Sequence, residues 1–174
     1  SQQIIADTSL SEWKITGPIP NIDTMAPMNS WNVTGRANCV RFQPGNNNTI
    51  WAGAASGGLW KSINGGSTWK PNDALDKLST IGVTDIAINP QDTNIMYIVT
   101  GDGHYESAYS IGLLKTIDGG NSWSILNCVS WNLTSNPNNR PVRVLINPLN
   151  PDTLLFQNTM DTQNNARNQR FRFL

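Results

Sequence analysis

The 174-residue sequence predicts an all-β fold built from a repeated four-stranded unit. Three observations lead to this prediction. Short apolar runs such as DIAIN and VRVLIN are bounded by turn-forming residues, and no stretch carries the apolar stripe of a helix. A strand–turn–strand segment with a central proline occurs three times. The turn SINGGSTW at 62–69 returns as TIDGGNSW at 116–123.

Each unit begins with an apolar strand, a polar turn around a proline and a second apolar strand. These segments lie at 39–53, 85–99 and 143–157, around Pro44, Pro90 and Pro148. In the first two units a third strand, the Gly-Gly turn and a fourth strand follow. Asn-Gly and Asp-Gly, at 64–65 and 118–119, are strong signals for a tight hairpin there, because Gly accepts positive φ.

The tryptophans that end the two Gly-Gly turns, Trp69 and Trp123, lie 54 residues apart. Four-stranded units that recur at about this spacing predict β-propeller blades. Such blades stack face to face and so bury surfaces that one sheet cannot bury alone. With only two complete units, we expect an incomplete propeller, a fragment whose missing blades come from a longer chain or another protein subunit. The predicted divisions are an N-terminal segment with a blade-closing strand (1–35), a first blade (36–82), a second blade (83–139), a partial third blade (140–158) and an irregular tail (159–174).

Both Gly-Gly turns resemble the Asp-box, or BNR repeat, of sialidases, sortilin-type receptors and xyloglucanase-type glycoside hydrolases. The matching residues are Ser62, Asn64, Gly66, Thr68 and Trp69, and again Thr116, Asp118, Gly120, Ser122 and Trp123. The resemblance covers about 12–157, and the first unit looks especially like secreted Bacteroidetes propellers. It implies a structural role: the side chain at 64 or 118 ties down the hairpin, and both tryptophans are expected to be buried between blades.

Composition and charge limit the partners, the cellular location and the cofactors that the sequence predicts. Twelve basic and twelve acidic residues cancel, which argues against nucleic acid or an anionic membrane as a partner, and no apolar stretch is long enough for a membrane span. Only 14% of residues are charged, and the many uncharged polar residues favour a secreted protein, extracellular or at the cell surface. In such an oxidising location Cys39 and Cys128 can form a disulfide or remain free thiols. One histidine and two distant cysteines predict no metal site, and no cofactor motif is present.

The loop between the second and third strands is eight residues longer in the second unit than in the first. Long loops on a rigid scaffold often bind ligands. The candidate ligand-binding residues in this loop are Asp102, His104, Tyr105, Glu106 and Tyr109. Aromatic rings and carboxylates together suit carbohydrate recognition. The alternative is that the tyrosines pack against a neighbouring blade and Asp102 caps the turn.

The sequence therefore predicts a binding or scaffold module whose ligand is a glycan or a protein. The alternative is a fragment of a secreted glycoside hydrolase, xyloglucanase- or sialidase-like. No catalytic residue is assigned, because the arginine triad and Tyr–Glu pair of sialidases have no identifiable counterpart, and activity of this chain alone is not expected. The tail carries Arg167, Arg170 and Arg172, which indicate either an altered chain end or a basic partner-binding segment.

Overall fold

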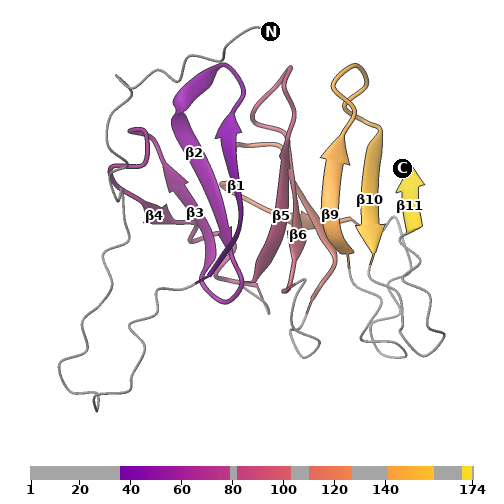
Figure 1. Cartoon of the computed structure of the whole chain (residues 1–174), viewed down its shortest axis with the longest axis horizontal. Coiled ribbons are helices and arrows are strands. Elements are labelled where there is room, and N and C mark those ends of the chain that lie inside the picture. Colours follow the sequence, from indigo (N-terminus) through magenta and orange to yellow (C-terminus); the bar gives the residue numbers. More distant parts are fainter. Residues whose placement is uncertain (1–35, 79–81, 103–109, 127–140, 159–169, 174) are drawn as a thin grey trace, which may run out of the picture. The chain divides into compact units, whose positions relative to one another are not determined.

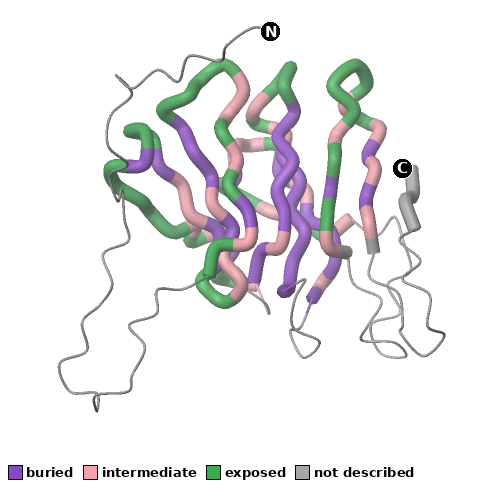
Figure 2. The backbone as a smooth tube through the Cα atoms, in the orientation of Figure 1, coloured by how far each residue is buried: buried purple, intermediate pink, exposed green. Residues whose placement is uncertain are grey.

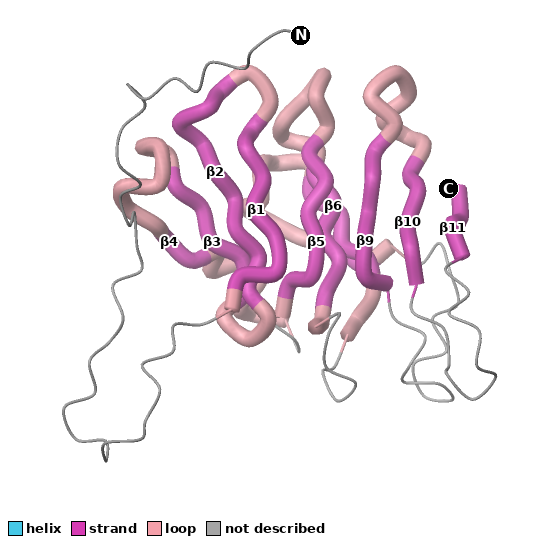
Figure 3. The backbone as a smooth tube through the Cα atoms, viewed as in Figure 1, coloured by secondary structure: helices cyan, strands magenta, loops and turns pink. Residues whose placement is uncertain are grey.

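The structure is a computed structural model that describes residues 36–78, 82–102, 110–126, 141–158 and 170–173. Strands are the regular elements within these ranges, and Figure 3 shows them joined by turns and loops. They form three antiparallel sheets, two of four strands and one of three. The prediction of an all-β fold made of four-stranded antiparallel sheets is confirmed.

The strands follow one another across each sheet in chain order (Figure 1). The first sheet contains β1 (Ala37–Gln43), β2 (Asn46–Ala54), β3 (Gly58–Ser62) and β4 (Lys70–Pro71). The second sheet contains β5 (Val83–Ile88), β6 (Met96–Thr100), β7 (Leu113–Thr116) and β8 (Ser124–Ile125). The third sheet contains β9 (Pro141–Ile146), β10 (Leu154–Asn158) and β11 (Arg170–Phe173).

The prediction of an irregular tail over 159–174 is wrong for its last residues. Arg170–Phe173 forms β11, which pairs with β10 from Asn158↔Arg170 to Leu155↔Phe173. The free edge of β10 offers unpaired N–H and C=O groups that an added strand can satisfy. No turn signal precedes the letters RFRF, so the sequence alone did not reveal this pairing.

The three inner strands of the second sheet, β5 to β7, are mostly buried on both faces, as the purple tube of β5 and β6 in Figure 2 shows, whereas β8 is exposed. Successive side chains of a strand point to opposite faces. Met96 and Ile98 of β6 therefore pack into a core with the first sheet, whereas Tyr97 and Val99 pack into a core with the third. A strand with two covered faces has no polar side, which explains the unbroken apolar run of β6.

The innermost strands β1, β5 and β9 lie at sheet edges, and β5 lies between the other two (Figure 1). Side chains from β1 satisfy backbone carbonyl groups along β5. Arg41 donates from Nε to the carbonyl oxygen of Ile86 at 3.0 Å, and Asn38 donates from Nδ2 to that of Val83 at 3.0 Å. Neighbouring sheets thus satisfy the polar edge that each would otherwise leave open.

One buried carboxylate on β5, that of Asp85, joins all three sheets. It forms an ion pair with Arg41 of β1. Its Oδ1 accepts the N–H of Ile86 at 3.0 Å, and its Oδ2 accepts the N–H of Val144 on β9 at 3.1 Å. Only 4% of Asp85 is exposed, so these partners replace the water that the charge loses.

We predict that Asp85→Ala lowers the free energy of unfolding by about 2 to 3 kcal/mol, because it leaves Arg41 without its carboxylate and the Val144 N–H without an acceptor. Asp85→Asn retains an acceptor and should lose less. The measurement is urea unfolding of the full chain at neutral pH. The exposed Asp152→Ala serves as the control and should change stability by less than about 0.5 kcal/mol. Equal losses for Asp85→Ala and Asp152→Ala would contradict the role of Asp85.

Candidate functional site

The second Gly-Gly hairpin (116–123) is held together by the Asp118 carboxylate. Its Oδ1 accepts the Thr116 hydroxyl at 2.6 Å and the N–H groups of Asn121 and Ser122, both at 2.9 Å. Its Oδ2 accepts the Ser122 hydroxyl at 2.5 Å. The Gly119 N–H reaches back to the carbonyl oxygen of Asn94 in the proline turn at 3.0 Å. The hairpin is therefore tied both to itself and to its own sheet.

The first Gly-Gly hairpin (62–69) uses an amide in place of that carboxylate. The Oδ1 of Asn64 accepts the Ser62 hydroxyl at 3.0 Å and the Thr68 N–H at 2.9 Å, while its Nδ2 donates to the Thr68 hydroxyl at 2.9 Å. The second glycine of each turn has nearly the same φ, 90° at Gly66 and 89° at Gly120. Asn and Asp thus fill the same structural position here.

Hydrogen bonds also set the charge state of Asp118. The hydroxyl groups of Ser122 and Thr116 donate to the ionised carboxylate and lower its pKa from 3.8 to about 2. Asn64 has no titrating group, so only the second hairpin gains a dependence on acid.

The two hairpin tryptophans differ in burial. Trp123 is half-buried, packs against the core between the first and second sheets, and donates from Nε1 to Oδ1 of Asn72 at 3.1 Å. Trp69 remains 37% exposed and donates to its own Gly66 carbonyl at 3.0 Å. The prediction that both are buried is wrong for Trp69, because no sheet among the described residues covers that side of the first hairpin.

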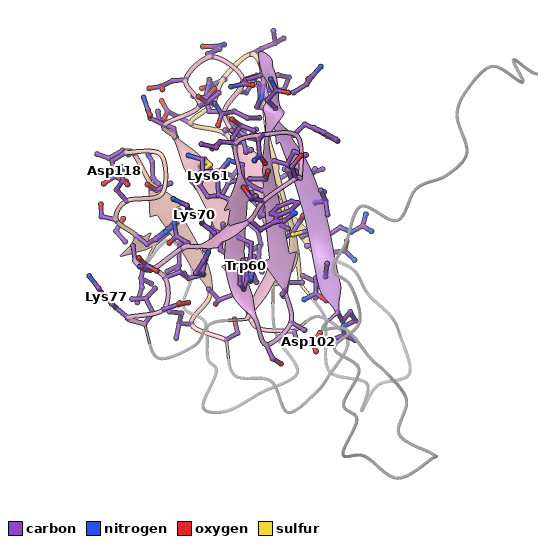
Figure 4. All side chains as sticks on the ribbon, turned by 90° about the vertical axis from the view of Figure 1, so that its left-hand side faces the viewer. Trp60, Lys61, Lys70, Lys77, Asp102 and Asp118 are labelled. Atoms are coloured by element: carbon purple, nitrogen blue, oxygen red, sulfur yellow. The ribbon has the colours of Figure 1, made fainter. Side chains whose placement is uncertain are left out.

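The long loop of the second unit leaves the sheet at the end opposite the Gly-Gly hairpins, as the positions of Asp102 and Asp118 in Figure 4 illustrate. Buried hydroxyls clamp its base. The Thr100 hydroxyl donates to the Gly112 carbonyl at 2.9 Å, accepts the Ile111 N–H at 2.9 Å, and lies 3.2 Å from the Ser110 hydroxyl. The Gly101 N–H donates to the Gly82 carbonyl at 2.8 Å.

Asp102 is one of the predicted ligand-binding residues, and the structure places it in an ion pair with Arg36. Asp102 is buried, whereas the Arg36 side chain remains 46% exposed. The pair joins the start of β1 to the residues that follow β6, so Asp102 connects two sheets. His104, Tyr105, Glu106 and Tyr109 lie outside the described residues.

A shallow groove of about 200 Å³ crosses the innermost strands and was not foreseen from the sequence. Phe42 and Leu145, which are 61% and 56% exposed, lie at its sides, and Ala87 lies between them on β5. Ala87 occupies the position of Arg41 in the repeat, so β5 sends no long side chain toward β9 there. In the sequence, only the small side chain of Ala87 at this repeat position could have indicated the groove.

Cys39 is a free buried thiol in the structure, and Cys128 lies outside the described residues. Burial raises the pKa of the Cys39 thiol to about 11, which keeps it protonated and unreactive at neutral pH. Among the described residues, no three side chains of His, Cys, Asp or Glu come together as metal ligands. The described segments also include no helix with the length and apolarity needed to cross a membrane.

Comparison with protein families and with curated protein sequences found no match. Among solved structures, an ancestral GH74 enzyme is similar over 71% of this chain, with a TM-score of 0.55 and 21% identity. A GH74 enzyme from Niastella koreensis matches over 78% of this chain, with a TM-score of 0.55 and 20% identity. YCF48 bound to D1 peptide matches over 79%, with a TM-score of 0.50 and 18% identity.

These similar structures are β-propellers, so the sheets of this chain have the fold of propeller blades. At such low identity the similarity establishes the fold alone. The chain spans 16% and 19% of the two GH74 enzymes and 41% of the YCF48 chain.

We predict that wild-type protein loses stability relative to Asp118→Asn as the pH falls from about 5 to 2. The folded-state pKa of Asp118 is depressed, so its ionised form stabilises the hairpin above the ordinary value of 3.8, and protonation removes this contribution on the way down to about 2. Above pH 5 the difference between the two proteins should be constant. Urea unfolding across this pH range, with the exposed Asp76→Asn as control, measures the effect. A difference that does not change with pH would refute it.

Proposed function

We propose that this chain is part of a β-propeller of Asp-box (BNR) type that serves, outside the cell or at its surface, as a binding or scaffold module. The observation that carries the proposal is the contrast between two equivalent loops. The first sheet joins its second and third strands through 55–57, whereas the second sheet uses 101–112. Hydrogen bonds of Thr100 with Ser110 and Gly112 hold the base of the longer loop, which gives it a fixed support.

The proposed ligand is a glycan or a surface protein. Tyr105 and Tyr109 supply aromatic faces for a sugar ring, and Glu106 supplies an acceptor for hydroxyl hydrogens. His104 makes binding sensitive to pH near neutrality. Because the carboxylate of Asp102 pairs with Arg36, its proposed contribution is to hold the base of the loop and to orient the exposed guanidinium.

The proposed partners are further blades, supplied by a longer chain or by another subunit. Two complete four-stranded sheets and one of three strands leave sheet surfaces that a closed propeller would cover. The composition, low in charge and rich in uncharged polar residues, supports a secreted location.

The rival function is part of a secreted glycoside hydrolase, and the similarity in fold to two GH74 enzymes favours it. Glycoside hydrolysis requires two carboxyl groups on either side of the scissile bond. In the described part of the loop end, the carboxylate of Asp102 is already held by Arg36. An enzyme of this kind would therefore need carboxyl groups from other blades.

Replacement of 103–109 by a short Gly-Ser linker tests the proposal. We expect binding to immobilised xyloglucan or sialylated oligosaccharides to weaken about tenfold or more, because the aromatic faces are lost. The equivalent loop of the first sheet is already Ala-Ser-Gly at 55–57, so the control is Ala55→Gly, which makes it Gly-Ser-Gly and should leave binding unchanged. Unchanged binding by a loop variant that still unfolds cooperatively would reject the loop as the site. Release of reducing sugar from xyloglucan by the unaltered chain would favour the rival.

A further inference from the structure

A single side-chain amide joins the first sheet to the hairpin of the second. Asn72 follows β4, and its Oδ1 accepts the indole N–H of Trp123 at 3.1 Å and the N–H of Leu75 at 3.0 Å. Its Nδ2 donates to the carbonyl oxygen of Gly120 at 2.7 Å. The amide thus satisfies one donor and one acceptor of the neighbouring hairpin at the same time.

The surroundings of this amide are closely packed. A Cβ atom on Gly120 would lie 3.1 Å from Cη2 of Trp51 and 3.3 Å from Nδ2 of Asn72. Leu75 and Met96 are fully buried in the same core. We call this contact the amide seam: Asn72 and Leu75 on one side, Gly120 and Trp123 on the other.

The first hairpin carries the same groups, but nothing described lies against them. Gly66 has the φ of Gly120, and Ile50 lies beneath Gly66 as Met96 lies beneath Gly120. Trp69 is nevertheless exposed, and its indole N–H turns to the Gly66 carbonyl at 3.0 Å. In the second hairpin Asn72 binds both the tryptophan N–H and the carbonyl of the second glycine. In the first hairpin these two groups, the Trp69 N–H and the Gly66 carbonyl, bind each other instead.

We propose that the surface formed by Gly66 and Trp69 is an interface for a further propeller-type sheet, and that this sheet presents a carboxamide side chain in the place of Asn72. A carboxylate can accept from the indole but cannot donate to the Gly66 carbonyl, and an ammonium can donate but cannot accept. A hydroxyl can do both but only through one oxygen atom, whereas Asn72 bonds the two groups through separate atoms, Oδ1 and Nδ2. A carboxamide does both. The interface continues the amide seam by one repeat and forms whether or not the loop end binds a glycan.

The first sheet carries a carboxamide at this repeat position, and the second sheet does not. Asn72 donates its own N–H to the Leu59 carbonyl at 2.8 Å, and in the second sheet Leu126 donates likewise to Leu113 at 2.9 Å. Leu126 therefore occupies the position of Asn72 but offers an aliphatic side chain. A further sheet fits the Trp69 surface if its fourth strand is followed by a carboxamide residue, as in the first sheet. A sheet whose fourth strand is followed by an aliphatic residue, as in the second sheet, does not fit it.

Asn72→Ala in the natural chain tests whether the amide makes the seam. We expect hydrogen exchange of the Trp123 indole N–H to accelerate about five- to tenfold, toward the rate of Trp69, because the side-chain acceptor is lost. Exchange at Trp69 should not change, and Asn72→Gln, which keeps a carboxamide, should restore part of the protection. NMR of the indole N–H signals, assigned by Trp→Phe substitutions, gives the rates. Unchanged protection of Trp123 would overturn the proposal.

A chain in which residues 37–82 are repeated in tandem tests the interface itself. The first copy then supplies Asn72 to the Trp69 of the second copy. We expect the second Trp69 indole to exchange about five- to tenfold more slowly than the first, and Asn72→Leu in the first copy to abolish the difference. Protection of Trp123 reports that the repeated chain is folded. Equal exchange of both Trp69 indoles while Trp123 stays protected would overturn the proposal, and if the repeated chain does not fold, the Asn72→Ala result decides.

Discussion

The carboxylate of Asp85 lies where the three sheets meet, and the arrangement of the inner strands depends on it. A sheet edge carries backbone donors and acceptors that cannot be buried without partners. Asp85 accepts an N–H from its own strand and another from β9, while Arg41 of β1 supplies the opposite charge and caps a carbonyl of β5. The sheets therefore meet through specific polar contacts at their inner edges and through apolar contacts elsewhere.

The outer strands use a different device for the same purpose. Each Gly-Gly hairpin is closed by its own Asx side chain and carries a tryptophan that is available for the neighbouring sheet. Where that sheet offers Asn72, the tryptophan is covered, and where none is described, it is exposed. Ligand recognition is proposed at the other end of the strands, so the proposed binding surface lies apart from the contacts between the hairpins and their neighbouring sheets. Changes confined to 103–109 would then alter the proposed ligand and leave in place the Asp102–Arg36 ion pair, which joins two sheets.

Much of the fold was visible in the sequence, because turn chemistry and strand alternation are local. The proline turns and Asn64-Gly65 marked the hairpins, and the short apolar runs marked the strands. Contacts between distant residues were not visible. The local pattern does not indicate that Asn72 donates to the Gly120 carbonyl or that Arg36 forms an ion pair with Asp102. It also does not indicate that Trp69 stays exposed. Each of these features depends on which distant segments the fold brings together.

Native-state hydrogen exchange at the Val144 amide tests the central claim most directly. This N–H points away from β10 and toward Asp85 on the neighbouring sheet. We expect it to exchange only with the same free energy of opening as the core amides of β5, because the inner edges of the sheets separate only when the sheets unfold together. Rapid exchange, typical of an amide at a free strand edge, would show that Asp85 does not hold the third sheet and would contradict the account.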